Sequence, residues 1–256
     1  MEKKHFLFIS PHLDDAVFSC GAFIAKLSAL GHFVTVLTLF SGSPTVKLSF
    51  LARALHKDWQ LPYDAPSARR SEDLKALSIV GAKGVYADFL DCIYRWDVQS
   101  GKPRYPRLEM FLGQQSVNEP CMIDEIRDYL TSIIRNGRYD HVFSPLGIGG
   151  HVDHLITHAA VRQLENACNT GQSHYYEDLP YAIDQQPDEP HPAGLRNYLC
   201  TYMNGEQLKH DAMAQYASQI KSPRYPDGID IDAIINYGER ICTKRSIFAE
   251  RVWFLG

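Results

Sequence analysis

The fold of this protein is decided by residues 5–40, HFLFISPHLDDAVFSCGAFIAKLSALGHFVTVLTLF. Its two ends, His5–Ile9 and Phe33–Phe40, are apolar runs without polar alternation, which is typical of parallel strands covered by helices on both faces. Between them, the stretch from Ala16 to Leu30 carries apolar residues at three- and four-residue steps, and Gly31 follows as a helix stop. These features predict a strand, a helix and a second, parallel strand in succession.

Similar patterns continue along the chain. They predict, in order, a helix, a strand, a helix, a strand and a helix at residues 67–80, 84–90, 122–135, 139–144 and 154–168. Residues 41–66 and 98–120 show no clean period, so we expect a surface excursion with a short helix at 48–56 and a long loop. In the last third we expect a strand edge at 175–181, a loop at 182–194, and helices at 208–220 and 229–241.

Strands that alternate with helices in this way predict the fold class. We expect an α/β fold, a Rossmann-like three-layer domain with a mostly parallel sheet. A length of 256 residues suits one large domain of this type, and nothing in the chain reads as a linker. Residues 1–256 are therefore predicted to form a single domain.

Composition excludes several classes of protein. Lys and Arg total 26 against 30 Asp and Glu, and the net charge of -4 does not suggest a surface that binds nucleic acid. No apolar run is long enough to span a bilayer, and the first one stops at Pro11 without a cleavage site for a signal peptide. The six cysteines form no C-x-x-C pair, which favours reduced thiols. We therefore expect a cytoplasmic protein that binds neither nucleic acid nor a membrane.

Two loops place metal-competent side chains directly after predicted strands. In open α/β sheets, ligands bind at the carboxyl ends of the strands, so neighbouring strands would bring both loops to one crevice. Each loop offers histidine and aspartate: the first has His12, Asp14 and Asp15, and the second has His151, Asp153 and His154.

These residue types point to a catalytic metal. Two imidazoles and one carboxylate with an open fourth position are a known zinc arrangement, and zinc lowers the pKa of a water molecule to about 7. The residues indicate one His and one Asp from the first loop and one His from the second, with the other groups free for proton transfer and oxyanion stabilisation. The same donors also suit iron or cobalt. His158 is a rival ligand, but it lies a full turn into an apolar helix, which favours a packed role.

A structural alternative applies to the first loop. An aspartate before a helix accepts hydrogen bonds from free backbone N–H groups, so Asp14 and Asp15 could form an N-cap cluster. One aspartate would suffice for that purpose. The second loop, after another strand, favours the metal hypothesis.

The two loops resemble those of a known family. Ser10–Ala16 (SPHLDDA) is similar to the P-H-P-D-D-E loop, and Gly150–His154 (GHVDH) to the H-x-D-H loop, of the PIG-L/LmbE-like zinc-dependent N-deacetylases. Arg69–Glu72 resembles the R-x-x-E helix of this family, and Tyr176–Tyr181 resembles a later segment of some members. The resemblance covers roughly residues 5–181.

The resemblance implies a role for each polar residue of the two loops. It makes His12, Asp15 and His154 the metal ligands, and Asp14 the general base that takes a proton from the attacking water and delivers one to the leaving amine. It makes His151 the group that stabilises the tetrahedral oxyanion, with Asp153 holding the His151 ring in its cationic form, since an acidic partner raises the pKa of an imidazole. The implied reaction removes an N-acetyl group from a hexosamine or a related amino sugar.

Two positions depart from the family pattern, and three others are candidates for substrate binding. Leu13 replaces a proline, which loosens the backbone but removes no ligand. Ala16 replaces an acid, and if that acid contacts sugar hydroxyls in the family, its loss bears on the identity of the substrate more than on hydrolysis, because no metal ligand is changed. Each candidate also has a structural alternative. Arg69 either clamps substrate or pairs with Glu72 or Glu177. Asp91 either contacts sugar hydroxyls or caps a turn, and Tyr181 is either an aromatic wall for a sugar or an ordinary tyrosine.

The main hypothesis is a zinc-dependent N-deacetylase acting on a small-molecule amino sugar or amino-sugar conjugate. One alternative is a metal-dependent amidohydrolase for a non-sugar or antibiotic-type N-acyl intermediate. The other is a non-catalytic sugar-binding module. The sequence leaves open whether the protein forms a homo-oligomer.

Overall fold

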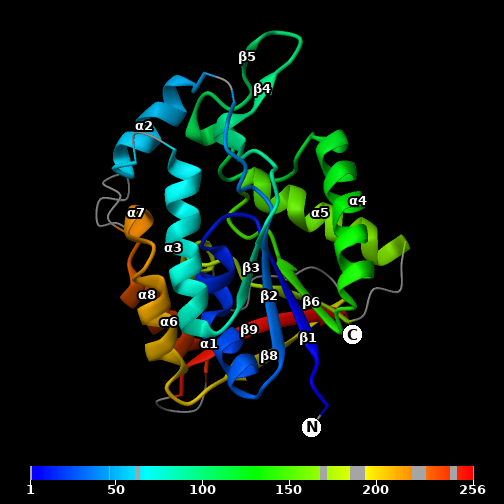
Figure 1. The fold of residues 1–256 in the computed structure, drawn as a ribbon, viewed down its shortest axis with the longest axis vertical. Coiled ribbons are helices and arrows are strands. Elements are labelled where there is room, and N and C mark those ends of the chain that lie inside the picture. Colours follow the sequence, from blue (N-terminus) through cyan, green and yellow to red (C-terminus); the bar gives the residue numbers. More distant parts are fainter. Residues whose placement is uncertain are drawn as a thin grey trace.

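The computed structural model describes residues 2–45, 47–61, 64–167, 172–184, 194–220, 229–242 and 247–255 (Figure 1). A seven-stranded sheet runs in the order β3-β2-β1-β6-β7-β9-β8. Its strands are β1 (His5–Ser10), β2 (Phe33–Thr38), β3 (Lys83–Tyr86), β6 (His141–Pro145), β7 (Gln172–Tyr176), β8 (Leu195–Thr201) and β9 (Ala249–Leu255). The first five of these are parallel to one another, and β9 is antiparallel to both β7 and β8. The predicted mostly parallel α/β fold is confirmed.

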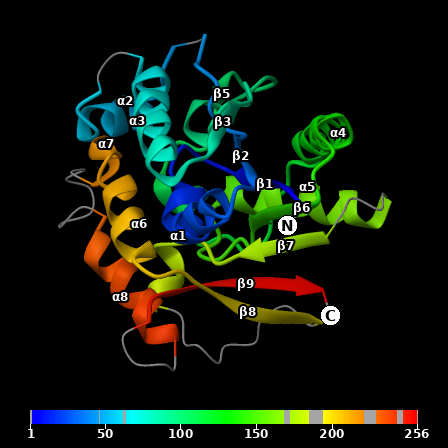
Figure 2. The same cartoon turned by 60° about the horizontal axis from the view of Figure 1, so that its bottom comes forward.

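Helices cover both faces of the sheet. Because side chains alternate along a strand, Phe8 of β1 packs into one core and Leu7 into the other. The first core receives α1 (Asp15–Ala29), α3 (Ala65–Val80), α6 (Gly205–Met213) and α8 (Ile231–Ile241), and the second receives α2 (Phe50–Asp58), α4 (Pro120–Gly137) and α5 (Val152–Ala167). Figure 2 shows α4 and α5 at one side of the molecule and α6 and α8 at the other. No helix in the described ranges is long and apolar enough to cross a membrane.

Some predicted elements differ from the structure. The helix predicted at 208–220 is interrupted, since α6 ends at Met213 and the short α7 spans Ala217–Ile220. The strand edge predicted at 175–181 is wrong after Tyr176, and β7 lies inside the sheet between β6 and β9. The predicted loop at 98–120 contains β5 (Lys102–Pro103), which pairs with β4 (Trp96–Asp97). Most of the predicted loop at 182–194, and Cys168, lie outside the described residues.

The sheet order brings the two polar loops together. Strands β1 and β6 are parallel neighbours, with Phe8 paired to Phe143, so their carboxyl ends lie at the same edge of the sheet. The two polar loops therefore meet at one edge of the sheet, as expected if their strands are neighbours. β7 follows β6 in the sheet, so the residues after β7 reach the same edge.

Candidate active site

Two histidines, one from each loop, converge on Asp15. Nδ1 of His12 and Nε2 of His154 each lie 3.2 Å from Oδ2 of Asp15, and all three residues are buried. Asp15 is the first residue of α1, and the backbone N–H of His12 donates to the same oxygen (2.7 Å). The structure thus brings together the three residues that the family resemblance assigns to a metal.

The capping alternative does not describe the side chains of the first loop. Asp14 occupies the N-cap position of α1 but makes no capping hydrogen bond. Instead, the hydroxyl of Ser10 accepts from the backbone N–H of Ala16 (3.1 Å) and donates to the carbonyl of His12 (2.6 Å). Because Ser10 satisfies the helix start, both aspartates are available for other contacts.

Each of the converging histidines has a carboxylate on its other nitrogen. Nε2 of His12 donates to Oδ2 of Asp153 (3.1 Å), and Nδ1 of His154 donates to Oδ1 of Asp178 (2.6 Å). Such carboxylate–histidine pairs fix the tautomer and orientation of metal-ligating imidazoles. They leave Nδ1 of His12 and Nε2 of His154 facing Asp15, and among the described residues this buried Nε2 has no hydrogen-bond partner of good geometry.

The electrostatics of the cluster favour positive charge between these rings. Burial alone would lower the pKa of His12, but its hydrogen bonds to Asp15 and Asp153 raise it well above 6.5. Burial opposes the charge of His154 as well, and Asp15 and Asp178 nevertheless raise its pKa to about 9. Buried carboxylates outnumber buried guanidiniums here: Asp14, Asp15, Asp91, Asp153 and Asp178 against Arg69 and Arg95.

The donors therefore fit a divalent cation, and more than one set is available. One ring nitrogen from each of His12, His151 and His154 lies within 4.8 Å of the other two, so His151 is a further candidate ligand beside His12 and His154. Further sets combine Asp153 with Cys92 and His151, or with His12 and Asp91. Neither Asp15 nor His158 is in these sets among the described residues. Asp15 nevertheless contacts both His12 and His154, whereas Nδ1 of His158 donates to the carbonyl of Pro145 (2.9 Å).

Asp14 has the surroundings of a group that titrates near neutral pH. Burial raises its pKa to about 6, against the opposing effect of Arg69, whose Nη2 lies 3.3 Å from Oδ2 of Asp14. The guanidinium of Arg69 also lies 4.9 Å from the ring centroid of Trp59. A carboxyl group with this pKa is suited to general acid–base work.

Arg69 is not paired as one alternative supposed. Glu72 accepts from the backbone N–H and hydroxyl of Ser218, and Glu177 accepts from Tyr237 and Arg251. In the described part of the chain, Arg69 forms its ion pair with Asp14, so the alternative that pairs it with Glu72 or Glu177 is contradicted.

His151 differs from the expectation that Asp153 holds it as a cation. The carboxylate of Asp153 faces His12 and Arg95, while its backbone N–H donates to Nδ1 of His151 (3.2 Å). Nε2 of His151 lies 4.0 Å from Sγ of Cys92. Burial and then the neighbouring His12 lower the pKa of His151 well below 6.5. Asp153 thus does not hold this ring through its carboxylate as expected, and the lowered pKa favours the neutral form. The neutral ring carries its proton on Nε2, where it remains a hydrogen-bond donor.

A cleft opens beside His151. Its volume is about 260 Å³, and its walls include Asp91, Trp59, Phe111 and Tyr181. Two of the three predicted substrate-binding residues, Asp91 and Tyr181, thus line this cleft, whereas Arg69 is not among its lining residues. Both roles weighed for Asp91 are compatible with the structure, because its Oδ1 accepts from the N–H of Ile93 (3.1 Å).

Two residues of the site were missed by sequence reasoning. Asp178 holds His154, and its second oxygen accepts from the N–H groups of Gly147 (2.8 Å) and Ile148 (2.9 Å). Asp178 follows β7, so the expectation that ligands bind at the carboxyl ends of parallel strands applies to this residue as well. Arg95, which donates to Asp153, carries no such signal.

Comparison with known proteins places the chain in a family. The PIG-L family model, described as GlcNAc-PI de-N-acetylase, matches residues 7–165, and the chain belongs to this family. It is 31% identical over 235 residues to a 2'-N-acetylparomamine deacetylase from Niallia circulans, covering 86% of this chain and 82% of that protein.

Two solved structures share the fold over nearly the full length. The zinc-inhibited form of a teicoplanin deacetylase is 29% identical with a TM-score of 0.85, covering 98% of this chain and 97% of that one. A deacetylase of the A40926 pseudoaglycone is 30% identical with a TM-score of 0.82, covering 100% of this chain and 98% of that one.

Proposed function

We propose that this protein hydrolyses the N-acetyl group of an amino sugar or amino-sugar conjugate in a metal-dependent reaction. The observation that carries the proposal is the convergence of His12 and His154 on Asp15, with Asp14 and His151 beside them. The related deacetylases support N-deacetylation of an amino-sugar conjugate rather than hydrolysis of a non-sugar amide or sugar binding without turnover.

His12, Asp15 and His154 would hold the metal ion. A divalent cation supplies Lewis-acid chemistry, polarising a carbonyl oxygen and lowering the pKa of water. We expect zinc, with iron or cobalt as the alternatives for the same donor set. Because one related deacetylase was solved in a zinc-inhibited form, the metal that supports turnover is best assigned by reconstitution with each ion in turn.

Asp14 and His151 would carry out the proton transfer and the stabilisation of charge. Asp14 takes a proton from the attacking water and returns one to the leaving amine, and its pKa of about 6 suits both steps. Nε2–H of the neutral His151 donates to the oxyanion that develops on the acetyl group. Arg69 holds the Asp14 carboxylate in place through its contact at 3.3 Å.

The cleft provides a site for the sugar. Asp91 is placed to accept hydrogen bonds from hydroxyl groups, and Tyr181 and Trp59 provide aromatic walls for the apolar face of a sugar ring. Because this cleft adjoins His151, a sugar bound in it would have its N-acetyl group next to the proposed catalytic residues.

The proposal is tested with metal-free protein reconstituted with Zn²⁺, Fe²⁺ or Co²⁺. Release of acetate and free amine is measured from N-acetylated amino sugars and, in parallel, from non-sugar amides. We expect activity on the amino sugars to depend on metal, and Asp14→Asn to lower kcat by about 10²- to 10⁴-fold because the general base is lost.

The matched control for this variant is Asp124→Asn, on the exposed surface of α4, which should retain native activity. Full activity of Asp14→Asn, at a metal content equal to that of the native protein, would exclude Asp14 as the base. Turnover of non-sugar amides alone would instead favour the alternative substrate class.

A further inference from the structure

One short segment, Cys92–Arg95, holds both oxygens of the Asp153 carboxylate. The backbone N–H of Cys92 donates to Oδ2 (3.0 Å), and Nη2 of Arg95 donates to Oδ1. The same Oδ2 accepts from Nε2 of His12 (3.1 Å). Rotation of this carboxylate would therefore break its contact with His12, and the Arg95 side chain opposes that rotation.

Arg95 is enclosed and makes few polar contacts. It is 6% exposed, and its guanidinium lies over the rings of Phe40 (5.4 Å) and Tyr105 (5.3 Å). Nη2 contacts Asp153 and lies 3.5 Å from Glu119, whereas Nε and Nη1 have no hydrogen-bond partner among the described residues. Buried donors without partners cost free energy. The ion pair with Asp153 is therefore the main contact that offsets the cost of burying the Arg95 charge.

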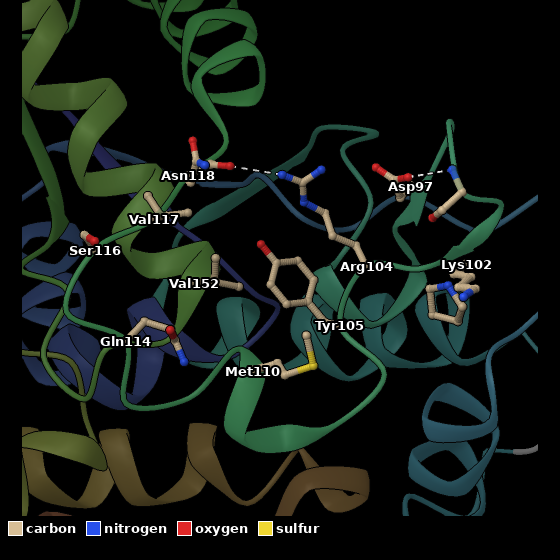
Figure 3. Close-up of a pocket in the computed structure, with 12 residues that line it drawn as sticks. Asp97, Lys102, Arg104, Tyr105, Met110, Gln114, Ser116, Val117, Asn118 and Val152 are labelled. Atoms are coloured by element: carbon tan, nitrogen blue, oxygen red, sulfur yellow. Dashed lines mark hydrogen bonds between the residues drawn. The ribbon is translucent and has the colours of Figure 1, made fainter.

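Glu119 has partners besides Arg95, whereas among the described residues Oδ1 of Asp153 has no other hydrogen-bond donor. The Glu119 carboxylate accepts from the hydroxyl of Tyr105 and lies 3.4 Å from Nε of Arg104. Both of these residues line a separate polar cavity of about 580 Å³, in which Arg104 reaches the carbonyl of Asn118 (Figure 3). In the described part of the chain, Arg95 is the only hydrogen-bond donor to Oδ1 of Asp153.

We propose that Arg95 is a positioning residue for the metal centre. By fixing the rotation of the Asp153 carboxylate, Arg95 keeps Nε2 of His12 engaged and Nδ1 of His12 turned toward Asp15. Within the described ranges, its ion pairs go to Asp153 and Glu119 alone and none to a proposed ligand, so it acts through Asp153. The inference rests on the proposed metal site.

The test measures zinc affinity by competition with a chromophoric chelator in the native protein, Arg95→Met and Arg95→Lys. We expect Arg95→Met to bind zinc about 10- to 100-fold more weakly, which is the range for losing the support of a ligating histidine. The zinc affinity of Arg95→Lys should fall by at least about threefold, because an ammonium group lacks the planar shape that stacks on two rings and directs Nη2 toward Asp153. The visible spectrum of the Co²⁺-loaded protein should change in both variants, since it reports ligand geometry.

The matched control is Tyr105→Phe, which keeps the ring beneath Arg95 and removes only the hydroxyl that donates to Glu119. We expect its zinc affinity to stay within about twofold of native, since its Arg95–Asp153 pair is intact. An equal loss in this control would assign the effect to general disturbance of the cluster and overturn the inference.

Native zinc affinity and a native Co²⁺ spectrum in folded Arg95→Met would also overturn it. Where Arg95→Met does not fold, the same result in Arg95→Lys decides against the inference. If the native protein itself binds neither zinc nor cobalt, the proposed metal site fails together with this inference. If the native protein binds metal and releases acetate while the variants match it, only the inference fails.

Discussion

At the scale of single residues, the adjacent acids Asp14 and Asp15 have different surroundings. Asp15 faces the ring nitrogens of two histidines, whereas Asp14 faces the guanidinium of Arg69. A helix start normally uses such an acid as a cap, but Ser10 takes that role here. The two carboxylates are therefore free for separate tasks, one proposed for the metal and one for the proton.

Asp178 gives a prediction at this scale. Asp178→Asn removes the charged partner of Nδ1 of His154, so we expect metal affinity to fall by about 10- to 100-fold. Chelator competition measures this fall, and Asp184→Asn, at an exposed position a few residues further on, is the control. Unchanged zinc binding in Asp178→Asn would show that His154 does not need this partner, or is not a ligand.

At the scale of elements, a buried ion pair supports a break in α1. The helix has non-helical angles at Cys20, and the N–H groups of Ala22 (3.1 Å) and Phe23 (2.7 Å) donate to the carboxylate of Glu250 on β9. Nζ of Lys209 on α6 lies 2.8 Å from this carboxylate, and the Lys209 side chain is fully buried. The ion pair therefore connects α1, α6 and β9, which are neighbours in the fold but distant in the sequence.

Removing one partner of this pair should be costly. We expect Lys209→Met to lower the free energy of unfolding by about 3–5 kcal/mol, because the Glu250 charge stays buried without its counter-ion. The double variant with Glu250→Gln should be more stable than Lys209→Met alone, since the amide oxygen still accepts from α1. Urea denaturation of the two variants gives the comparison, and a loss below about 1 kcal/mol in Lys209→Met would contradict it.

The starts of β6 and β7 provide a prediction about pH. Burial, and then the neighbouring His141, lower the pKa of His174 from 6.5 to about 4, with Nδ1 of His141 at 3.2 Å from Nε2 of His174. Between these two pH values the unfolded chain binds a proton at this position that the folded chain does not. The contribution of His174 to stability is thus present above pH 6.5 and is lost as the pH falls toward 4.

His174→Phe should remove this dependence. The free energy of unfolding of the native protein should drop more between pH 8 and about pH 5 than that of the variant, as measured by chemical denaturation at both pH values. His5→Gln, at an exposed position, is the control and should follow the native protein. Parallel pH dependence in the native protein and His174→Phe would contradict the account.

Sequence patterns predict elements best where the pattern is local. The apolar runs of β1 and β2 and the periodicity of α1 lie within residues 5–40, and each is confirmed within two residues. By contrast, β8 and β9 were not predicted, because these strands pair with each other across about 50 residues of chain and β8 leaves most of its side chains partly or fully exposed. Between α6 and α7, the hydroxyl of Tyr216 donates to the distant Asp73 on α3 (2.6 Å), a contact that local periodicity does not reveal.

At the scale of the whole molecule, the candidate site is assembled by the strand order. β1, β6 and β7 are consecutive in the sheet, and the residues after them supply Asp15, His154 and Asp178. The first two could be predicted from the sequence, since each stands in a polar loop after an apolar run. Arg95 could not, because only the folded chain brings the segment after β3 against Asp153.

The central claim is that the two loops share one cation. The most direct measurement is an anomalous-difference map from crystals of zinc-loaded protein, collected at the zinc absorption edge. We predict one strong peak between Nδ1 of His12, Oδ2 of Asp15 and Nε2 of His154. A map without a peak at this position, or with zinc peaks only at other residues, would contradict the account.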